Sequence, residues 1–171
     1  MKKSFESVLN KFNSPLWGFH CMLPEEVSEF FLGKDIKRLV CQINGEHEFS
    51  CALMPKGDGL YFININKEIR TKFHLQIGDK VQLELWPDES KYGLPMPEEM
   101  EVLLQQDPEA DKLFHALTPG KQRSLLFMIG KPKTSAIQLN KALAITEYLK
   151  GAGGKVDFKE MNAFIRSFRK Y

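Results

Sequence analysis

The sequence predicts an α+β protein, in which a small β-barrel or sandwich is followed by a C-terminal helical bundle. Up to about residue 90, short alternating apolar runs are separated by turn signals at roughly 8–12-residue spacing. After a segment rich in proline, glycine and charge, the apolar residues recur at the helical period. We therefore expect two domains, residues 1–90 and residues 91–171.

The first half opens with short elements. SPLWGFHCML (14–23) predicts an aromatic strand, and PEEVSEFF predicts a short helix that begins at Pro24. The stretch RLVCQINGEHEFSCALM (38–54) predicts a β-hairpin around Asn44-Gly45.

The buried face decides the register of this hairpin. A three-residue loop, 43–45, sets Leu39 opposite Phe49 and Cys41 opposite His47, which gathers apolar side chains on one face. A two-residue turn does not, so we predict the three-residue loop, with its glycine in the left-handed conformation.

Cysteine is sparse, and Cys21, Cys41 and Cys51 form no CxxC pair of the kind used by zinc sites and redox motifs. In the predicted register Cys51 faces Lys37, so a disulfide within the hairpin is not expected. We predict buried free thiols, which pack like small hydrophobic residues.

The stretch PKGDGLYFI (55–63) could be a phosphate-binding loop or a turn. A dinucleotide-binding loop needs a third glycine and a following helix. Here Gly57 and Gly59 precede LYFININ, whose β-branched and aromatic residues predict a strand, and no GKS or GKT follows. We therefore predict a hairpin turn.

The rest of the first half continues this pattern. Residues 67–73 predict a short helix or turn, Gly78-Asp79 a turn, and KVQLELW (80–86) a strand. PDESKYGLPMP (87–97) reads as a linker.

Capping signals divide the second half into helices. Helix starts are predicted at Pro97, at Asp107-Pro108, at Thr118-Pro119, at Thr134 or Ser135, and at Asp157, which pairs with Glu160 in a capping-box-like pattern. Gly130 with Pro132, and then Gly151, predict helix ends.

Two helices have a predicted core face. The first carries the stripe Leu139, Ala142, Leu143, Thr146 and Leu149. On the last helix Phe158, Met161, Ile165 and Phe168 face one way, with Lys159, Arg166 and Lys170 on the other side.

Charge is distributed unevenly along the chain. Residues 94–110 contain five acids and no base, whereas residues 111–171 contain 12 Lys+Arg against four Asp+Glu. Such a basic region suits a polyanionic partner. The predicted nucleic-acid contacts are Lys121, Arg123, Lys159 and Arg166; a solvated face or a membrane-surface helix are the alternatives.

Residues 17–88 resemble a small bacterial β-barrel domain of unknown function. The resemblance rests on Leu53-Met54-Pro55, Gly57-Asp58-Gly59, the segment from Asn66 to Arg70, and Gly78-Asp79. It implies a double-split barrel, the architecture of AbrB-like and MazE-like transcription factors.

Residues 95–170 resemble the YdeI/OmpD-associated, or bacteriocin-protection, family. DPEADKLFHALTPGKQRSLLFMIGKPKT and VDFKEMNAFIRSF carry this resemblance. Members usually have an arginine-rich helix start after the threonine that corresponds to Thr134, whereas this chain has Ser-Ala-Ile-Gln at 135–138. Neither resemblance implies a reaction.

The sequence contains few signs of a catalytic or metal-binding site. The histidines show no HxH or HExxH spacing, and no GxSxG motif or catalytic-thiol signature is present. We therefore predict no catalytic residue, metal site or cofactor. The candidates for binding a small molecule are Arg70, Asp79 and Asp58, in a pocket between barrel and bundle; their alternative role is to stabilise turns.

The sequence thus favours a non-enzymatic binding or regulatory protein acting in a stress or bacteriocin-protection response. A small-molecule-binding protein or enzyme is the alternative, and a protein-interaction module that uses exposed strand edges is the third. No run of roughly 20 apolar residues could span a bilayer, and polar residues interrupt the signal-like start, so we expect a cytoplasmic protein.

Overall fold

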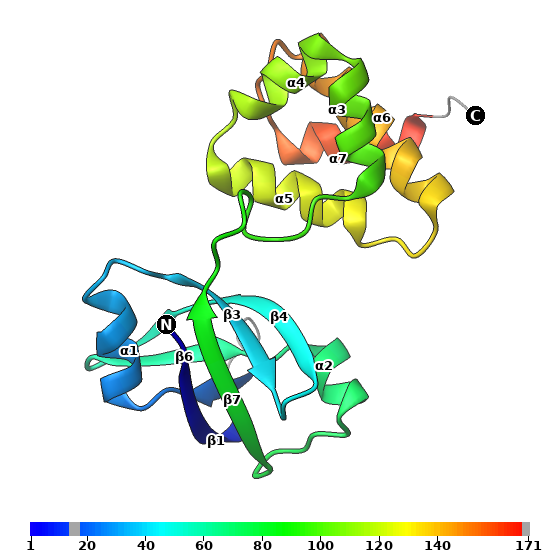
Figure 1. Cartoon of the computed structure of the whole chain (residues 1–171). Helices are drawn as coiled ribbons and strands as arrows, with labels where there is room; N and C mark the ends of the chain where they lie inside the picture. The colour runs from blue at the N-terminus through cyan, green and yellow to red at the C-terminus, as the bar shows by residue number, and fades with distance from the viewer. Residues whose placement is uncertain (14–17, 169–171) are drawn as a thin grey trace. The chain divides into compact units, whose positions relative to one another are not determined.

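A computed structural model describes residues 1–13 and 18–168 of the chain (Figure 1). It forms two compact units, Met1–Glu89 and Ser90–Tyr171, which we describe separately. Among the described residues, the first unit holds seven strands and two helices, and the second holds five helices. The predicted α+β class is confirmed.

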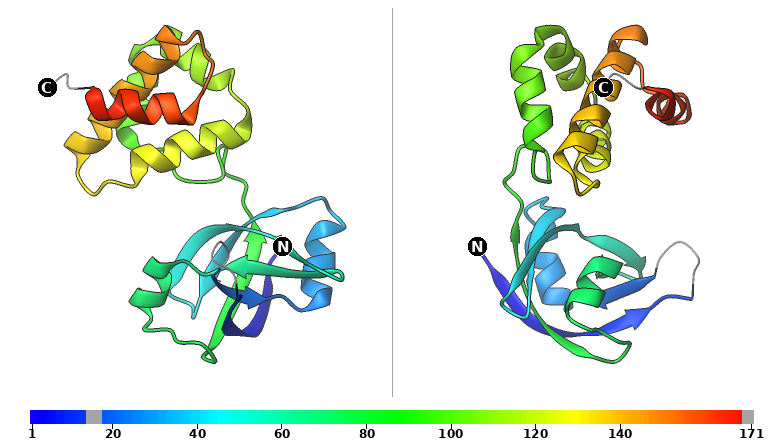
Figure 2. Two further views of the ribbon diagram at one scale, coloured as in Figure 1. Left: turned by 180° about the vertical axis from the view of Figure 1, so that it is seen from behind. Right: turned by 90° about the vertical axis from the view of Figure 1, so that its right-hand side faces the viewer.

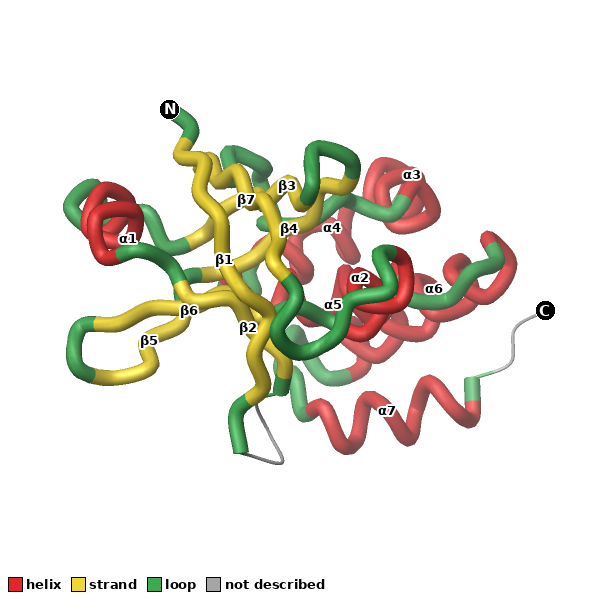
Figure 3. The backbone as a smooth tube through the Cα atoms, turned by 90° about the horizontal axis from the view of Figure 1, so that it is seen from below, coloured by secondary structure: helices red, strands yellow, loops and turns green. Residues whose placement is uncertain are grey.

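The first unit is one curled antiparallel sheet (Figures 1 and 3). Its strands follow the order β4-β3-β7-β1-β2-β6-β5. They are β1 (Lys3–Lys11), β2 (Phe19–Met22), β3 (Arg38–Ile43), β4 (His47–Ala52), β5 (Met54–Gly57), β6 (Leu60–Asn64) and β7 (Lys80–Pro87). Residues 14–17 of the first predicted strand lie outside the described residues; residues 19–22 of it form β2.

Strand β1 organises the sheet, although sequence patterns place no strand there. Its first part pairs with β7, from Lys3 opposite Leu85 onward, and its last part pairs with β2, where Leu9 faces Cys21. Figure 3 shows β1 running between these two neighbours. Leu9 is fully buried, and the buried Ser7 hydroxyl donates to the Met22 carbonyl at 2.8 Å. The apolar signal is weak because a serine occupies one of the inward positions.

The hairpin of β3 and β4 corrects the predicted register. Leu39 faces Cys51 and Cys41 faces Phe49, because the three-residue loop comprises residues 44–46 rather than 43–45. Gly45 is left-handed as predicted (φ 71°), and Asn44 is left-handed as well (φ 51°). The side chain of Asn44 accepts a hydrogen bond from Gln82 N of the neighbouring β7, at 3.0 Å. This contact with another strand holds Asn44 in the turn, and the hairpin sequence alone does not contain that information.

The predicted turns at residues 57–59 and 78–79 are confirmed. Gly57, Asp58 and Gly59 all have positive φ between β5 and β6, and Gly78 has φ 94° before β7. Helix α1 (Glu25–Leu32) follows Pro24, and α2 (Lys67–Lys72) begins where the Asn66 side chain accepts from Ile69 N at 2.9 Å.

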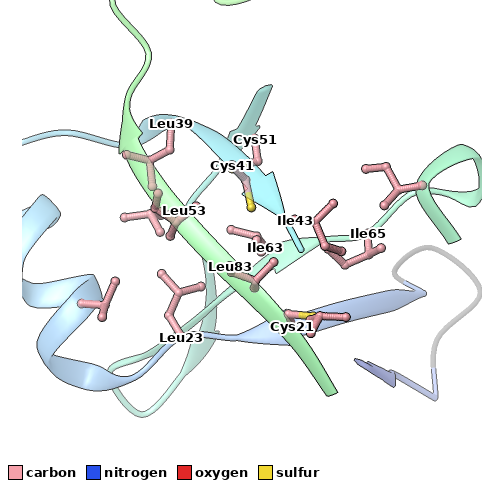
Figure 4. Packing of buried hydrophobic residues seen from close by; sticks show 14 of the residues in the cluster. Cys21, Leu23, Leu39, Cys41, Ile43, Cys51, Leu53, Ile63, Ile65 and Leu83 are labelled. Carbon is pink, nitrogen blue, oxygen red and sulfur yellow. The ribbon is translucent and has the colours of Figure 1, made fainter. Parts of the chain in front are cut away.

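The core of the first unit contains all three cysteines. Cys21, Cys41 and Cys51 are buried and unbridged among leucine and isoleucine side chains (Figure 4), as predicted. Burial raises the pKa of the Cys21 thiol to about 11 and that of Cys51 to about 12. These thiols therefore stay protonated at neutral pH and act as packing groups.

The second unit consists of the helices α3 (Glu98–Gln106), α4 (Pro108–His115), α5 (Pro119–Gly130), α6 (Ser135–Gly151) and α7 (Phe158–Ser167). The predicted caps are confirmed, since the side chains of Asp107, Thr118, Thr134 and Asp157 each accept from a backbone N–H three residues later. Part of the predicted linker belongs to this unit, because Tyr92, Leu94 and Met96 pack against its core.

Helix α6 lies at the centre of the second unit. Figure 2 shows α3 and α4 on one side of it and α7 on the other. Ala142, Thr146 and Leu149 are buried as predicted, but Leu139 is 42% exposed. The buried face also includes Ala144 and Ile145, because four other helices contact α6 and its core face is broader than one stripe.

On α7 the predicted core face is partly confirmed. Met161 is fully buried and Ile165 packs against the core, whereas Phe158 at the first turn is 37% exposed. Lys159 and Arg166 are exposed.

Candidate functional site

The predicted small-molecule residues of the first unit lie at separate places. Asp58 is exposed in the β5–β6 turn, and the exposed Asp79 accepts a hydrogen bond from Gln76 N at 2.8 Å, which stabilises its own turn. Arg70 lies on α2. Within the described part of the chain, no hydrogen bond or ion pair joins these three side chains.

Arg70 has an unusual environment. Its guanidinium carbon lies 3.6 Å from the centroid of the Phe19 ring, a close cation–π contact. Its Nε is buried and has no hydrogen-bond partner within residues 1–13 and 18–168. Lys11 approaches the same ring at 5.3 Å. Arg70 thus packs as part of a cationic and aromatic layer.

A second such layer surrounds His20. Its ring stacks on Phe12 with centroids 3.6 Å apart and meets Phe62 edge-on at 5.5 Å, while Lys56 lies 5.8 Å from the Phe12 ring. His20 is only 3% exposed. Burial lowers the pKa of His20, the Gly18 carbonyl opposes this shift, and the Lys56 charge adds to it. The residue is therefore a neutral packing group near neutral pH.

The four predicted nucleic-acid contacts, Lys121, Arg123, Lys159 and Arg166, lie on two helices, and we refer to them together as the basic surface. Lys121 and Arg123 lie in the first turns of α5, and Lys159 and Arg166 lie at opposite ends of α7. Lys121, Lys159 and Arg166 are exposed and Arg123 is partly exposed. None of the four has an ion-pair partner among the described residues. Their charges are therefore available to solvent or a partner.

Acids gather on the other helices. Glu98, Glu99 and Glu101 lie on α3, and Glu109 and Asp111 lie on α4. Figure 2 shows α6 between these helices and α7, so the acids of α3 and α4 lie on helices across α6 from the helix that carries Lys159 and Arg166. Lys150 of α6 forms an ion pair with Asp107, which lies between α3 and α4.

The second unit also contains a hydrogen-bonded chain that sequence reasoning missed. The Tyr92 hydroxyl lies 2.7 Å from His115 Nε2, and His115 Nδ1 lies 3.0 Å from Asp111 Oδ1. The spacing of Asp111 and His115, four residues apart on one helix, is a signal that the sequence contains. Tyr92 could not be assigned to it, because the segment that holds Tyr92 is irregular.

This chain borders a partly open cavity of about 490 Å³, which we call the Tyr92 cavity. Leu104, Met96 and Pro108 form its apolar part. Its polar lining comprises Lys91, Tyr92, Glu101, Gln105, Asp111 and His115. A volume of this size suits a small organic molecule.

A second hollow of about 580 Å³ lies between α3 and α6. Val102 and Leu139 line it and are each more than 40% exposed, so this hollow accounts for the exposure of Leu139 noted above. Glu98 and Glu99 lie at its rim, and Glu99 accepts a hydrogen bond from Ser135.

Two other kinds of site are absent from the part of the chain that the structure describes. No three His, Cys, Asp or Glu side chains are grouped so that they could hold a metal ion. No helix there is both long and apolar enough to cross a membrane.

Comparison with known families divides the chain in two. Residues 5–85 match a domain of unknown function (DUF1905), and residues 94–150 match the family described as Bacteriocin-protection, YdeI or OmpD-Associated. These are the two resemblances that the sequence motifs indicated, with different bounds. The first match begins earlier than expected, within β1, and the second ends at residue 150, before the motif VDFKEMNAFIRSF. Among curated proteins the chain has no match.

Proposed function

We propose that this protein is a binding protein that holds nucleic acid through its phosphate backbone at the basic surface. The observation that carries this proposal is that Lys121, Arg123, Lys159 and Arg166 are solvent-accessible and have no ion-pair partner among the described residues. Cations in this state release condensed counterions when they neutralise phosphates, which favours binding at low salt.

Two features of α5 and α7 support an anionic partner. Lys121 and Lys159 lie in first turns, where free backbone N–H groups add positive partial charge. The apolar residues Met161 and Ile165 of α7 pack into the core, so its outer side is polar. A polar outer side favours a soluble polyanion over insertion into a membrane surface.

The test is an anisotropy titration of the whole protein against labelled DNA and RNA at several salt concentrations. Changing Lys121, Arg123, Lys159 and Arg166 together to Glu should weaken binding by about two orders of magnitude or more at low salt. For four phosphate contacts, the slope of log K against log salt for the unchanged protein should be about −3 to −4.

A matched variant controls for net charge. Lys37, Lys56, Lys67 and Lys80 are exposed in the first unit, and changing them to Glu alters the formal charge equally. This control should bind almost as tightly as the unchanged protein. If both variants lose affinity equally, or neither does, the basic surface is not the binding site.

The physiological setting follows from the second family match. That family is described by its link to bacteriocin protection, and we infer a protection-related role for this chain on that basis. The curled sheet supports the double-split barrel of AbrB-like and MazE-like regulators, and the packing of four helices around α6 supports a helical bundle. The cytoplasmic location remains part of the proposal, and cell fractionation tests it.

A small-molecule role for Arg70 is the second candidate. The Nε of Arg70, which is buried at the Phe19 ring and has no hydrogen-bond partner among the described residues, favours it, because such a donor gains from a ligand that accepts its hydrogen bond. A thermal-shift screen of anionic metabolites should then raise the melting temperature of the unchanged protein but not of Arg70→Ala. A ligand that stabilises both proteins equally would remove Arg70 from the site.

A further inference from the structure

We propose that the Tyr92 cavity binds a small organic cation, an amine with an apolar body. This site is separate from the basic surface, because its residues come from α3, α4 and the segment before α3. It therefore adds a second ligand to the proposed function rather than restating it.

The direction of the hydrogen bonds determines what the cavity offers. His115 Nδ1 faces two acceptors, the Asp111 carboxylate and the Asp111 carbonyl, each at 3.0 Å, so this nitrogen carries the proton. With the proton on Nδ1, Nε2 is the acceptor for the Tyr92 hydroxyl at 2.7 Å. The lone pairs of the Tyr92 oxygen are left as acceptors.

The other polar groups of the cavity are mostly acceptors as well. Glu101 contributes an exposed carboxylate from α3, and Asp111 a carboxylate from α4. Two carboxylates, Glu101 and Asp111, outnumber the cation Lys91 in this lining, so a ligand that donates hydrogen bonds and carries positive charge fits it better than a carboxylate or phosphate does.

The walls of the cavity define the rest of the ligand. Leu104 is 7% exposed at the apolar side, beside Met96 and Pro108. The Tyr92 ring already holds the ammonium group of Lys91 5.3 Å from its centroid, so the surface of this ring accommodates a cation. An amine attached to a short hydrocarbon or aromatic group satisfies both the acceptors and the walls.

The experiment compares three probes of nearly equal shape by calorimetry and by NMR on the whole protein: phenethylamine, phenethyl alcohol and 3-phenylpropionate. We expect the amine to bind, the alcohol to bind roughly tenfold more weakly, and the carboxylate not to bind. The resonances of Tyr92 and His115 should shift on addition of the amine.

Variants locate the site. Glu101→Gln and Tyr92→Phe should each weaken amine binding by roughly five- to tenfold, because each removes an acceptor while it preserves the shape of the side chain. Glu109→Gln removes a nearby exposed carboxylate that does not line the cavity, and it should leave affinity within about twofold. Lys91→Gln should leave affinity unchanged or raise it, since it removes a competing cation.

Three results would each overturn the proposal. They are equal binding of the amine and the alcohol, amine-induced NMR shifts confined to residues other than Tyr92 and His115, and an equal effect of Glu101→Gln and Glu109→Gln. A failure of nucleic-acid binding at the basic surface would leave it untouched, because no residue is shared between the two sites.

Discussion

The two units use their cations differently. In the first unit, Lys2, Lys3, Lys11, Lys34, Lys56, Arg70 and Lys72 each lie over an aromatic ring. In the second unit, the cations of the basic surface contact no ring and no acid among the described residues. These seven cations of the first unit therefore contribute to packing. In the second unit Lys91 and Lys131 also lie over rings and Lys150 is ion-paired, but the four cations of the basic surface are available to a partner. The number of basic residues in a unit therefore does not by itself locate a binding surface.

Replacing a ring should give the largest contrast between the units. Phe30 is half-buried, meets Phe31 edge-on at 5.2 Å and carries Lys3 and Lys34 at 4.2 and 5.3 Å. Phe30→Ala should lower the free energy of unfolding of the first unit by about 2–4 kcal/mol, because it removes packing and two cation–π contacts.

Phe127 is the matched residue in the second unit, 60% exposed with Lys131 at 6.0 Å. Phe127→Ala should change stability by less than about 0.5 kcal/mol. Urea unfolding measures both, with tryptophan fluorescence reporting on the first unit, which holds both tryptophans, and helical ellipticity reporting mainly on the second. Similar losses for the two variants would contradict the comparison.

Mildly acidic pH should produce a smaller difference in stability between the two units than the ring replacements do. The lowered pKa of buried His20 means that the folded first unit binds fewer protons than the unfolded chain below the ordinary pKa of 6.5. The stability of the first unit should therefore fall as pH drops from about 7 to 5.

The hydrogen bond from Lys150, and then the N–H of Ala110, lower the pKa of Asp107 in the second unit. The stability that the ionised Asp107 carboxylate contributes is present above the ordinary pKa of 3.8. It is lost only as the pH falls through the lower pKa of the folded state.

The measurement is urea unfolding at pH 7 and pH 5 with the same two signals. The fluorescence transition should move to lower urea at pH 5, and the ellipticity transition should stay. His20→Phe should reduce the shift, because it keeps a ring beside Phe12 and cannot titrate. A shift of the same size in His20→Phe would assign the effect to other groups.

The resemblances and turn chemistry predicted much of what the structure contains. The helix starts at Asp107, Thr118, Thr134 and Asp157 were predictable because a cap joins a side chain to an N–H three residues away. Local sequence contains both partners of such a bond. The glycine-rich turns follow for the same reason, since positive φ is a property of one residue.

The register of β3 and β4 was not predictable to the same degree. The loop length was correct, but Asn44 bonds to Gln82 of β7, which lies 38 residues away, and the pairing shifted with it. Strand β1 was missed because its partners β2 and β7, rather than its own apolar content, stabilise it.

The sequence by itself determined the α+β class, the helix caps, the tight turns, the free thiols and the uneven charge. Each depends on composition or on residues within one turn of each other. Tertiary structure alone decided which cations lie on rings, which remain exposed, and that Tyr92, His115 and Asp111 form one hydrogen-bonded chain. The physical reason is that the deciding contacts, such as Arg70 on Phe19 and Tyr92 with His115, join segments distant in sequence, and only packing of the core brings such segments within bonding distance.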